Sequence, residues 1–76
     1  MKELIEYLAK RLVDRPEEVR VHEVIAETTN VYELKVGDGE LGEVIGKHGQ
    51  TIRAIRTILS GVAAKEGRRV VLELLE

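Results

Sequence analysis

Two glycines that bracket a lysine and a histidine form the segment of this chain best suited to chemistry. They are Gly46 and Gly49, with Lys47 and His48 between them, in the run Val-Ile-Gly-Lys-His-Gly-Gln-Thr-Ile at positions 44–52. Glycine lets another backbone approach closely because it has no Cβ. A helical pattern begins directly after the second glycine, so unpaired backbone N–H groups and the helix dipole should favour an anion there. With the charge of Lys47 added, the segment predicts a phosphate-binding loop.

A pair of glycines three positions apart is common, and a tight turn between two helices without a ligand is the alternative. The surroundings of the loop favour binding over this alternative. Helical patterns lie on both sides of the loop, and strand patterns lie outside the helices. We therefore interpret the loop as part of a nucleic-acid site.

The charge distribution supports that interpretation, although the formal net charge of the chain is only −2. Residues 1–43 hold six Lys or Arg and eleven Asp or Glu, a net charge of −5, whereas residues 44–69 hold six and one, a net charge of +5. A local basic patch is what phosphate binding needs, whatever the total charge. A solvated helix face is the alternative for Lys65 and Arg68.

Apolar and basic residues around the loop are candidates for the same site. Ile45 and Ile52 could serve both the core and a groove for bases. Arg53 and Arg56 follow Ile52 by one and four positions, so they flank the buried side of the helix and could contact phosphates. Pairing with glutamates of the amino-terminal half is the alternative for both arginines. Aromatic residues make up only 3% of the chain, which disfavours a surface where bases stack on aromatic rings.

Six elements are predicted to position these residues. Their order is helix, strand, strand, helix, helix and strand, over residues 2–14, 19–27, 31–36, 40–45, 50–66 and 69–75. The two adjacent strands should form a hairpin, and a right-handed crossover through the helix pair should set the last strand parallel to the second. The predicted fold is α+β, with one three-stranded mixed sheet covered on one face by three helices.

The alternation of side chains predicts which residues form the core. Tyr32, Leu34 and Val36 should share the buried face of the second strand. The long helix should bury a stripe at helical spacing, namely Ile52, Ile55, Leu59 and Val62.

Composition and length exclude several classes of protein. Seventy-six residues predict a single domain, 1–76. The chain has no cysteine and only two distant histidines, so neither a disulfide nor a metal site is expected. There is no apolar run near the ~20 residues of a membrane span and no signal-peptide pattern, which predicts a cytoplasmic protein. No nucleophile–base pair, dinucleotide signature or P-loop is visible, so we expect neither an enzyme nor a cofactor or small-molecule substrate.

The element order, with the glycine loop between the two central helices, resembles the type II KH domain over essentially the whole chain. More narrowly, the chain is similar to small bacterial KH-domain RNA-binding proteins, in the segments 1–10, 41–49, 54–57 and 63–73. In KH domains the GxxG loop clamps about four backbone nucleotides.

This resemblance implies a role for each candidate residue. The clamp would be Gly46, Lys47, His48 and Gly49, although His48 stands where an uncharged polar residue is more usual. The apolar platform for bases would be Val44, Ile45 and Ile52, with Leu34 or Val36 as possible additions. Arg53 would extend the phosphate contacts, and Arg56 would do so less directly.

The resemblance also implies the biology. It suggests a cytoplasmic protein that binds single-stranded RNA with low sequence specificity, as an RNA chaperone or post-transcriptional regulator linked to cell elongation and division. It further implies a homodimer, or a heterodimer with a larger KH-containing protein. Two alternatives stay open: a KH fold used mainly for protein–protein docking, and a DNA-binding helix–turn–helix at residues 40–58.

Overall fold

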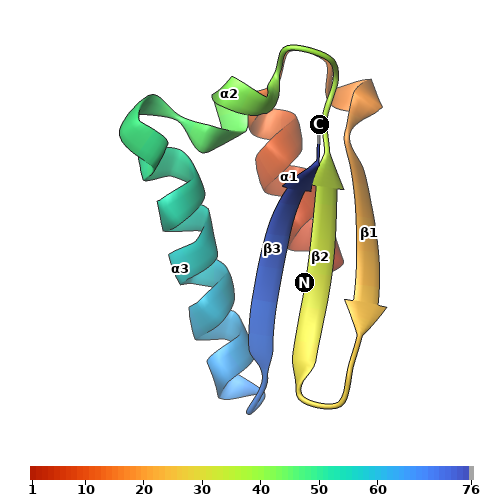
Figure 1. The fold of residues 1–76 in the computed structure, drawn as a ribbon, viewed down its shortest axis with the longest axis vertical. Helices are drawn as coiled ribbons and strands as arrows, with labels where there is room; N and C mark the ends of the chain where they lie inside the picture. Colours follow the sequence, from red (N-terminus) through yellow and green to blue (C-terminus); the bar gives the residue numbers. More distant parts are fainter. Residues whose placement is uncertain (76) are drawn as a thin grey trace.

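A computed structural model describes residues 1–75 of the chain. The predicted order of elements is confirmed (Figure 1): α1 (Lys2–Leu12), β1 (Arg20–Ile25), β2 (Thr29–Lys35), α2 (Leu41–Ile45), α3 (Gln50–Lys65) and β3 (Arg69–Leu75). Two short 3-10 turns that the sequence did not predict complete the list, η1 (Pro16–Glu18) and η2 (Lys47–Gly49).

The three strands form one mixed sheet in the order β1–β2–β3. β1 and β2 are the antiparallel arms of a hairpin, and β3 pairs with β2 in parallel, as predicted. The helices lie on one face of this sheet. Figure 1 shows α1 behind the strands and α3 beside β3, at the edge of the sheet away from β1.

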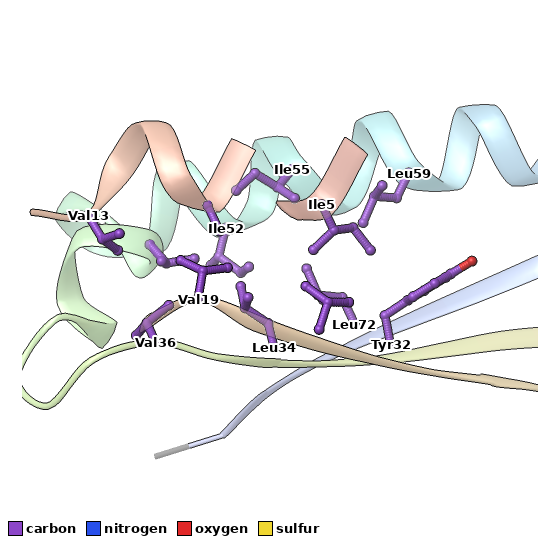
Figure 2. Close-up of a cluster of buried hydrophobic side chains, with 13 residues drawn as sticks. Ile5, Val13, Val19, Tyr32, Leu34, Val36, Ile52, Ile55, Leu59 and Leu72 are labelled. Atoms are coloured by element: carbon purple, nitrogen blue, oxygen red, sulfur yellow. The ribbon is translucent and has the colours of Figure 1, made fainter. Parts of the chain in front are cut away.

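The core lies between the helices and that face of the sheet, and Figure 2 shows its side chains enclosed between helices and the strands. The alternation predicted for β2 is confirmed, because Tyr32 and Leu34 are each 1% exposed and Val36 is 6% exposed. Leu34 and Val36 are therefore core residues. The suggestion that they extend a platform for bases is wrong, since almost no surface of either residue remains accessible.

One position of the long helix differs from the prediction. Ile52, Ile55 and Leu59 are buried as expected, but Ala63 takes the fourth place and Val62 is 38% exposed. Successive helical residues are ~100° apart, so the position four residues after Leu59 faces the core more directly than the position three after it.

The connection that leads into α2 is fixed by a buried carboxylate. Glu40, the residue before α2, is 5% exposed. Its Oε2 accepts hydrogen bonds from the backbone N–H groups of Asp14 (2.6 Å) and Arg15 (3.1 Å), and its Oε1 lies 3.4 Å from Arg15 Nε. This long-range contact ties the segment that follows α1 to the start of the helix pair that carries the glycine loop.

Residues 1–75 contain neither a membrane-spanning helix nor a cluster of metal ligands. No helix in this range is both long and apolar enough to cross a bilayer. No group of three or more His, Asp or Glu side chains in this range is placed to hold a metal ion.

Candidate nucleic-acid interface

The glycine loop joins α2 to α3 through a run of unusual backbone angles. Gly46 has φ 76° and ψ 173°, a conformation that is essentially confined to glycine. His48 (φ 57°, ψ 24°) and Gly49 (φ 73°, ψ 12°) follow in the left-handed region. The N–H of Gly49 donates to the carbonyl of Gly46 (3.1 Å), which closes the turn.

Glycine is required at the two positions of the loop for different structural reasons. A Cβ on Gly46 would lie 2.6 Å from the Cβ of Thr51 and closer still to its Oγ1. A Cβ on Gly49 would meet nothing within 4 Å, so only its positive φ favours glycine there. Gly46 therefore permits the close packing of the loop against the first turn of α3, whereas Gly49 leaves open space beside the loop.

The side chains between the glycines point to solvent. Lys47 and His48 are both exposed, and neither has a hydrogen-bond or ion-pair partner within residues 1–75. The N-terminus of α3 next to them has no side-chain cap. A lysine ammonium beside an uncapped helix N-terminus is a suitable site for an anionic group.

A groove runs from this loop along α3 and then between α3 and β3. Its first hollow has a volume of about 490 Å³ and is lined by Gly49, Ile52, Arg53, Arg56, Thr57 and Ser60. At Arg56 and Ser60 it meets a second hollow of about 310 Å³, whose other lining residues are Leu59, Val70, Val71 and Leu72. We call these two hollows together the α3–β3 groove. No acidic residue lines either hollow, so the groove combines apolar walls with positive charge.

Arg53 and Arg56 lie on this side of α3 but in different environments. Both side chains are exposed, but Arg53 has no side-chain partner in the described part of the chain. Arg56 Nη2 donates a hydrogen bond to the carbonyl of Leu72 in β3 (2.9 Å), which links the helix to the strand. Neither arginine pairs with a carboxylate of the described residues, so the alternative of ion pairs with the amino-terminal half finds no support.

The three apolar residues expected beside the loop have three different positions. Ile52 is 7% exposed and lines the groove as well as the core. Ile45 is half-buried and packs against the core without lining the groove. Val44 is 0% exposed, so its expected place on a surface for bases is wrong: its side chain is enclosed in the core and can only support the loop from below.

Several lining residues were missed in the sequence. Thr57 and Ser60 share a side of α3 with Arg53 and Arg56, and the helical spacing of these four residues could have revealed them. Val70 and Val71 line the groove from β3, but the sequence carries no signal for which strand would flank the helix.

At the end of the molecule away from the glycine loop, where α3 leads into β3, Arg68 forms hydrogen bonds that stabilise the fold. Arg68 Nε donates to Asn30 Oδ1 (2.7 Å), and its two terminal nitrogens donate to the carbonyls of Glu27 (3.1 Å) and Ala26 (2.6 Å). Arg68 thus holds the β1–β2 turn instead of forming a solvated helix face. Lys65 remains exposed and does not line the groove.

A polar network continues from Arg68 into the core. Asn30 is 7% exposed, and its Nδ2 donates to the hydroxyl of Tyr32 at 3.4 Å. That hydroxyl donates to Glu23 Oε2 (2.7 Å). Burial, and next the hydrogen bond to Glu23, raise the pKa of the Tyr32 phenol above its ordinary value.

Comparisons with known proteins are consistent with this geometry. A family model described as "KhpA/KhpB, KH domain" matches residues 2–74. A comparison with solved structures found no significant match.

Among curated proteins, similar chains span the whole length. One from Chlamydia pneumoniae is 53% identical over 76 residues, covering 100% of this chain and 97% of the relative. One from Aquifex aeolicus is 53% identical, covering 100% and 96%. One from Clostridium perfringens is 49% identical over 75 residues, covering 99% and 100%. Each of the three is named RNA-binding protein KhpA.

Proposed function

The chain belongs to the KhpA/KhpB family of KH domains, and from this premise we propose that it binds single-stranded RNA with low sequence specificity. One observation carries the proposal: the glycine loop, with exposed Lys47 beside the uncapped N-terminus of α3, opens directly into a groove that has arginines and no carboxylates. The names of the relatives, which describe RNA-binding proteins and not enzymes, support it.

Each part of the surface has a separate task in this proposal. Gly46, Lys47, His48 and Gly49 hold the sugar–phosphate backbone of about four nucleotides, and Arg53 extends the phosphate contacts. The apolar walls of the α3–β3 groove accept the bases. Because most contacts are to the backbone, the binding discriminates only weakly between sequences.

The finer biological roles rest on the family resemblance. These roles are an RNA chaperone or a post-transcriptional regulator linked to cell elongation and division, acting in the cytoplasm. A domain with one groove offers limited contact area, so joining two grooves would strengthen binding without new contacts.

An exposed apolar strip on α3 supports self-association and also favours the rival function of protein docking. Ile58 is 49% exposed and Val62 is 38% exposed, and Ala54 and Gly61 lie on the same side of the helix. The helical positions of these residues place the strip away from the groove. The occupant would be a second copy of the chain or a larger KH-containing protein.

Fluorescence anisotropy with a short labelled single-stranded RNA tests the proposal. Lys47→Glu should weaken binding by about tenfold, whereas Lys65→Glu, which makes the same charge change outside the groove, should change it less than twofold. The logarithm of the affinity should fall linearly with the logarithm of salt concentration, and losing one phosphate contact should reduce that slope by about 0.7. Substituting Gly46 would be a poor test, because a side chain there collides with Thr51.

Three results would overturn the proposal. Equal weakening by the two lysine variants would mean that only net charge matters. No binding to RNA, with association retained by Lys47→Glu and lost by Ile58→Glu, would establish the docking module instead. A preference for duplex DNA over single strands would revive the helix–turn–helix alternative, which the strands on both sides of α2 and α3 disfavour.

A further inference from the structure

Arg56 occupies the point where the two hollows of the α3–β3 groove meet. It lines both hollows, and its Nη2 donates to the carbonyl of Leu72. The backbone N–H of Arg69 points toward the β2 side, where it donates to Thr28. Because alternate residues of a strand direct their backbone groups to opposite sides, the carbonyl of Leu72 lies on the outer edge of β3. Arg56 therefore reaches across the groove to the far wall.

This bridge holds an exposed cation against the apolar walls of the groove. A guanidinium has five N–H donors and no acceptor, and one of the five is directed at Leu72. Around it lie Leu59, Val70 and Leu72, and no carboxylate lines either hollow. The remaining donors are held in a rigid planar fork, ready for a partner that enters the groove.

Arg53, one turn earlier, is placed differently. It lines the first hollow beside Gly49 but not the second, and its side chain has no partner in the described residues. Its donors are therefore available next to the loop, where they suit phosphates. A phosphate retains water more strongly than a base does, so the part of a nucleotide that enters between the apolar walls beside Arg56 is the base.

We propose that Arg56 is a specificity-determining residue that reads base edges, and that it favours bases with two adjacent acceptors, guanine and cytosine, over adenine and uracil. Guanine offers O6 and N7 to an arginine fork, and cytosine offers N3 and O2. Adenine places an amino donor beside each acceptor of its outer edges, and uracil places its N3–H between two carbonyls. This inference rests on the proposed RNA binding and adds a base preference to it.

The test separates base contacts from phosphate contacts. Anisotropy at low salt would compare RNA octamers of cytidine, of uridine, of adenosine and of alternating guanosine and uridine with an abasic ribose–phosphate strand of equal length. The wild type should bind the octamers that contain cytosine or guanine about tenfold more tightly than those of adenosine or uridine. Arg56→Met should remove this preference and weaken binding of the abasic strand by less than Arg53→Met does. Arg53→Met, the matched control, should weaken all five strands by a similar factor.

Arg56→Lys distinguishes recognition of base edges by Arg56 from its structural hydrogen bond to the Leu72 carbonyl. A lysine retains one donor for the Leu72 carbonyl but loses the fork, so it should keep the melting temperature and lose the base preference. The inference is overturned if the wild type binds all octamers equally, or if Arg56→Met weakens the abasic strand as much as the others. It is also overturned if Arg56→Lys retains the preference. A different result would contradict the proposed RNA binding itself: the wild type would bind none of the strands.

Discussion

The loop end and the hairpin end of the molecule both carry positive charge but use it in different ways. At the loop end, Lys47 and Arg53 are exposed and have no side-chain partner among the described residues. At the hairpin end, Arg68 donates to three acceptors that hold the β1–β2 turn. The comparison teaches that a basic residue counts toward a binding surface only when the fold leaves its donors available.

The two ends also differ in what maintains their shape. The loop depends on backbone conformation, because positive φ values occur at Gly46, His48 and Gly49. The hairpin end depends on side-chain hydrogen bonds that run from Arg68 through Asn30 to Tyr32. Substitutions should therefore act at the loop through strain and at the hairpin through lost partners.

The largest effect is expected from Gly46→Ala at the loop end. The new methyl group would collide with Thr51 in a backbone region that alanine avoids, so we expect a loss of about 3 kcal/mol of unfolding free energy. In a domain of this size that corresponds to a melting temperature lower by about 10 °C or more, measurable by circular dichroism.

Two other glycines make this prediction sharp. Gly49→Ala has only an unfavourable φ to overcome and should cost about 1 kcal/mol. Gly42→Ala, inside α2 with nothing near its Cβ, should be neutral or stabilising by roughly 0.5 kcal/mol. If Gly46→Ala and Gly49→Ala were equally stable, the contact with Thr51 would not be what Gly46 serves.

The next largest effect tests whether Arg68 serves stability and Lys47 serves RNA binding. Arg68→Met removes a charged donor from buried Asn30 and should lower the unfolding free energy by about 2 kcal/mol. RNA affinity, measured well below the melting temperature, should change less than twofold. Lys47→Met should do the reverse, with a stability change below about 0.5 kcal/mol and a clear loss of affinity. Loss of RNA binding in Arg68→Met at full stability would break the comparison.

The smallest effect concerns Tyr32 and alkaline pH. Because burial and Glu23 raise the pKa of its phenol in the folded protein, the stability linked to its neutral form is present below about pH 10 and falls as pH rises through the folded-state pKa. Tyr32→Phe should lose about 1 kcal/mol at pH 7. It should also show a shallower decline in urea-denaturation stability between pH 9 and 11 than the wild type.

Tyr7→Phe is the control for that measurement. Tyr7 is 56% exposed, so removing its hydroxyl should leave both the stability at pH 7 and its decline at alkaline pH close to those of the wild type. Equal pH profiles for Tyr32→Phe and the wild type would show that the buried phenol does not contribute to alkaline unfolding.

Periodicity and turn residues were sufficient to predict the element order, and the preference for right-handed crossovers then predicted the parallel pairing of β3. Periodicity and turn residues are local signals, and they located the loop and the buried face of β2 correctly. They predicted that Val62 would be buried, but the buried residue is its neighbour Ala63, because tertiary packing decides which of the two faces the core. They also started the second strand at residue 31, which excluded Asn30, although Asn30 lies in β2 and is buried.

The candidate site was less predictable because its second wall comes from a distant segment. The sequence identified Arg53 and Arg56 but could not place the carbonyl of Leu72 beside Arg56. Nor could it show that Arg68 has acceptors 38 to 42 residues away. The family resemblance assigned Val44 to the platform for bases, but an apolar residue near a loop can serve either the core or a groove, and only packing decides between these.

The topology of the sheet also has a consequence for folding kinetics. β2 pairs with β1 through a short hairpin, but each residue of β2 pairs with a residue of β3 that lies 40 positions later, from Thr29 with Arg69 to Lys35 with Leu75. Closing the longer connection costs more chain entropy, and non-local pairing slows folding. We therefore expect the hairpin to form early and β3 to join late, so that substitutions in β3 act mainly on the unfolding rate. Since β3 forms one wall of the α3–β3 groove, the groove should be among the last parts of the molecule to form.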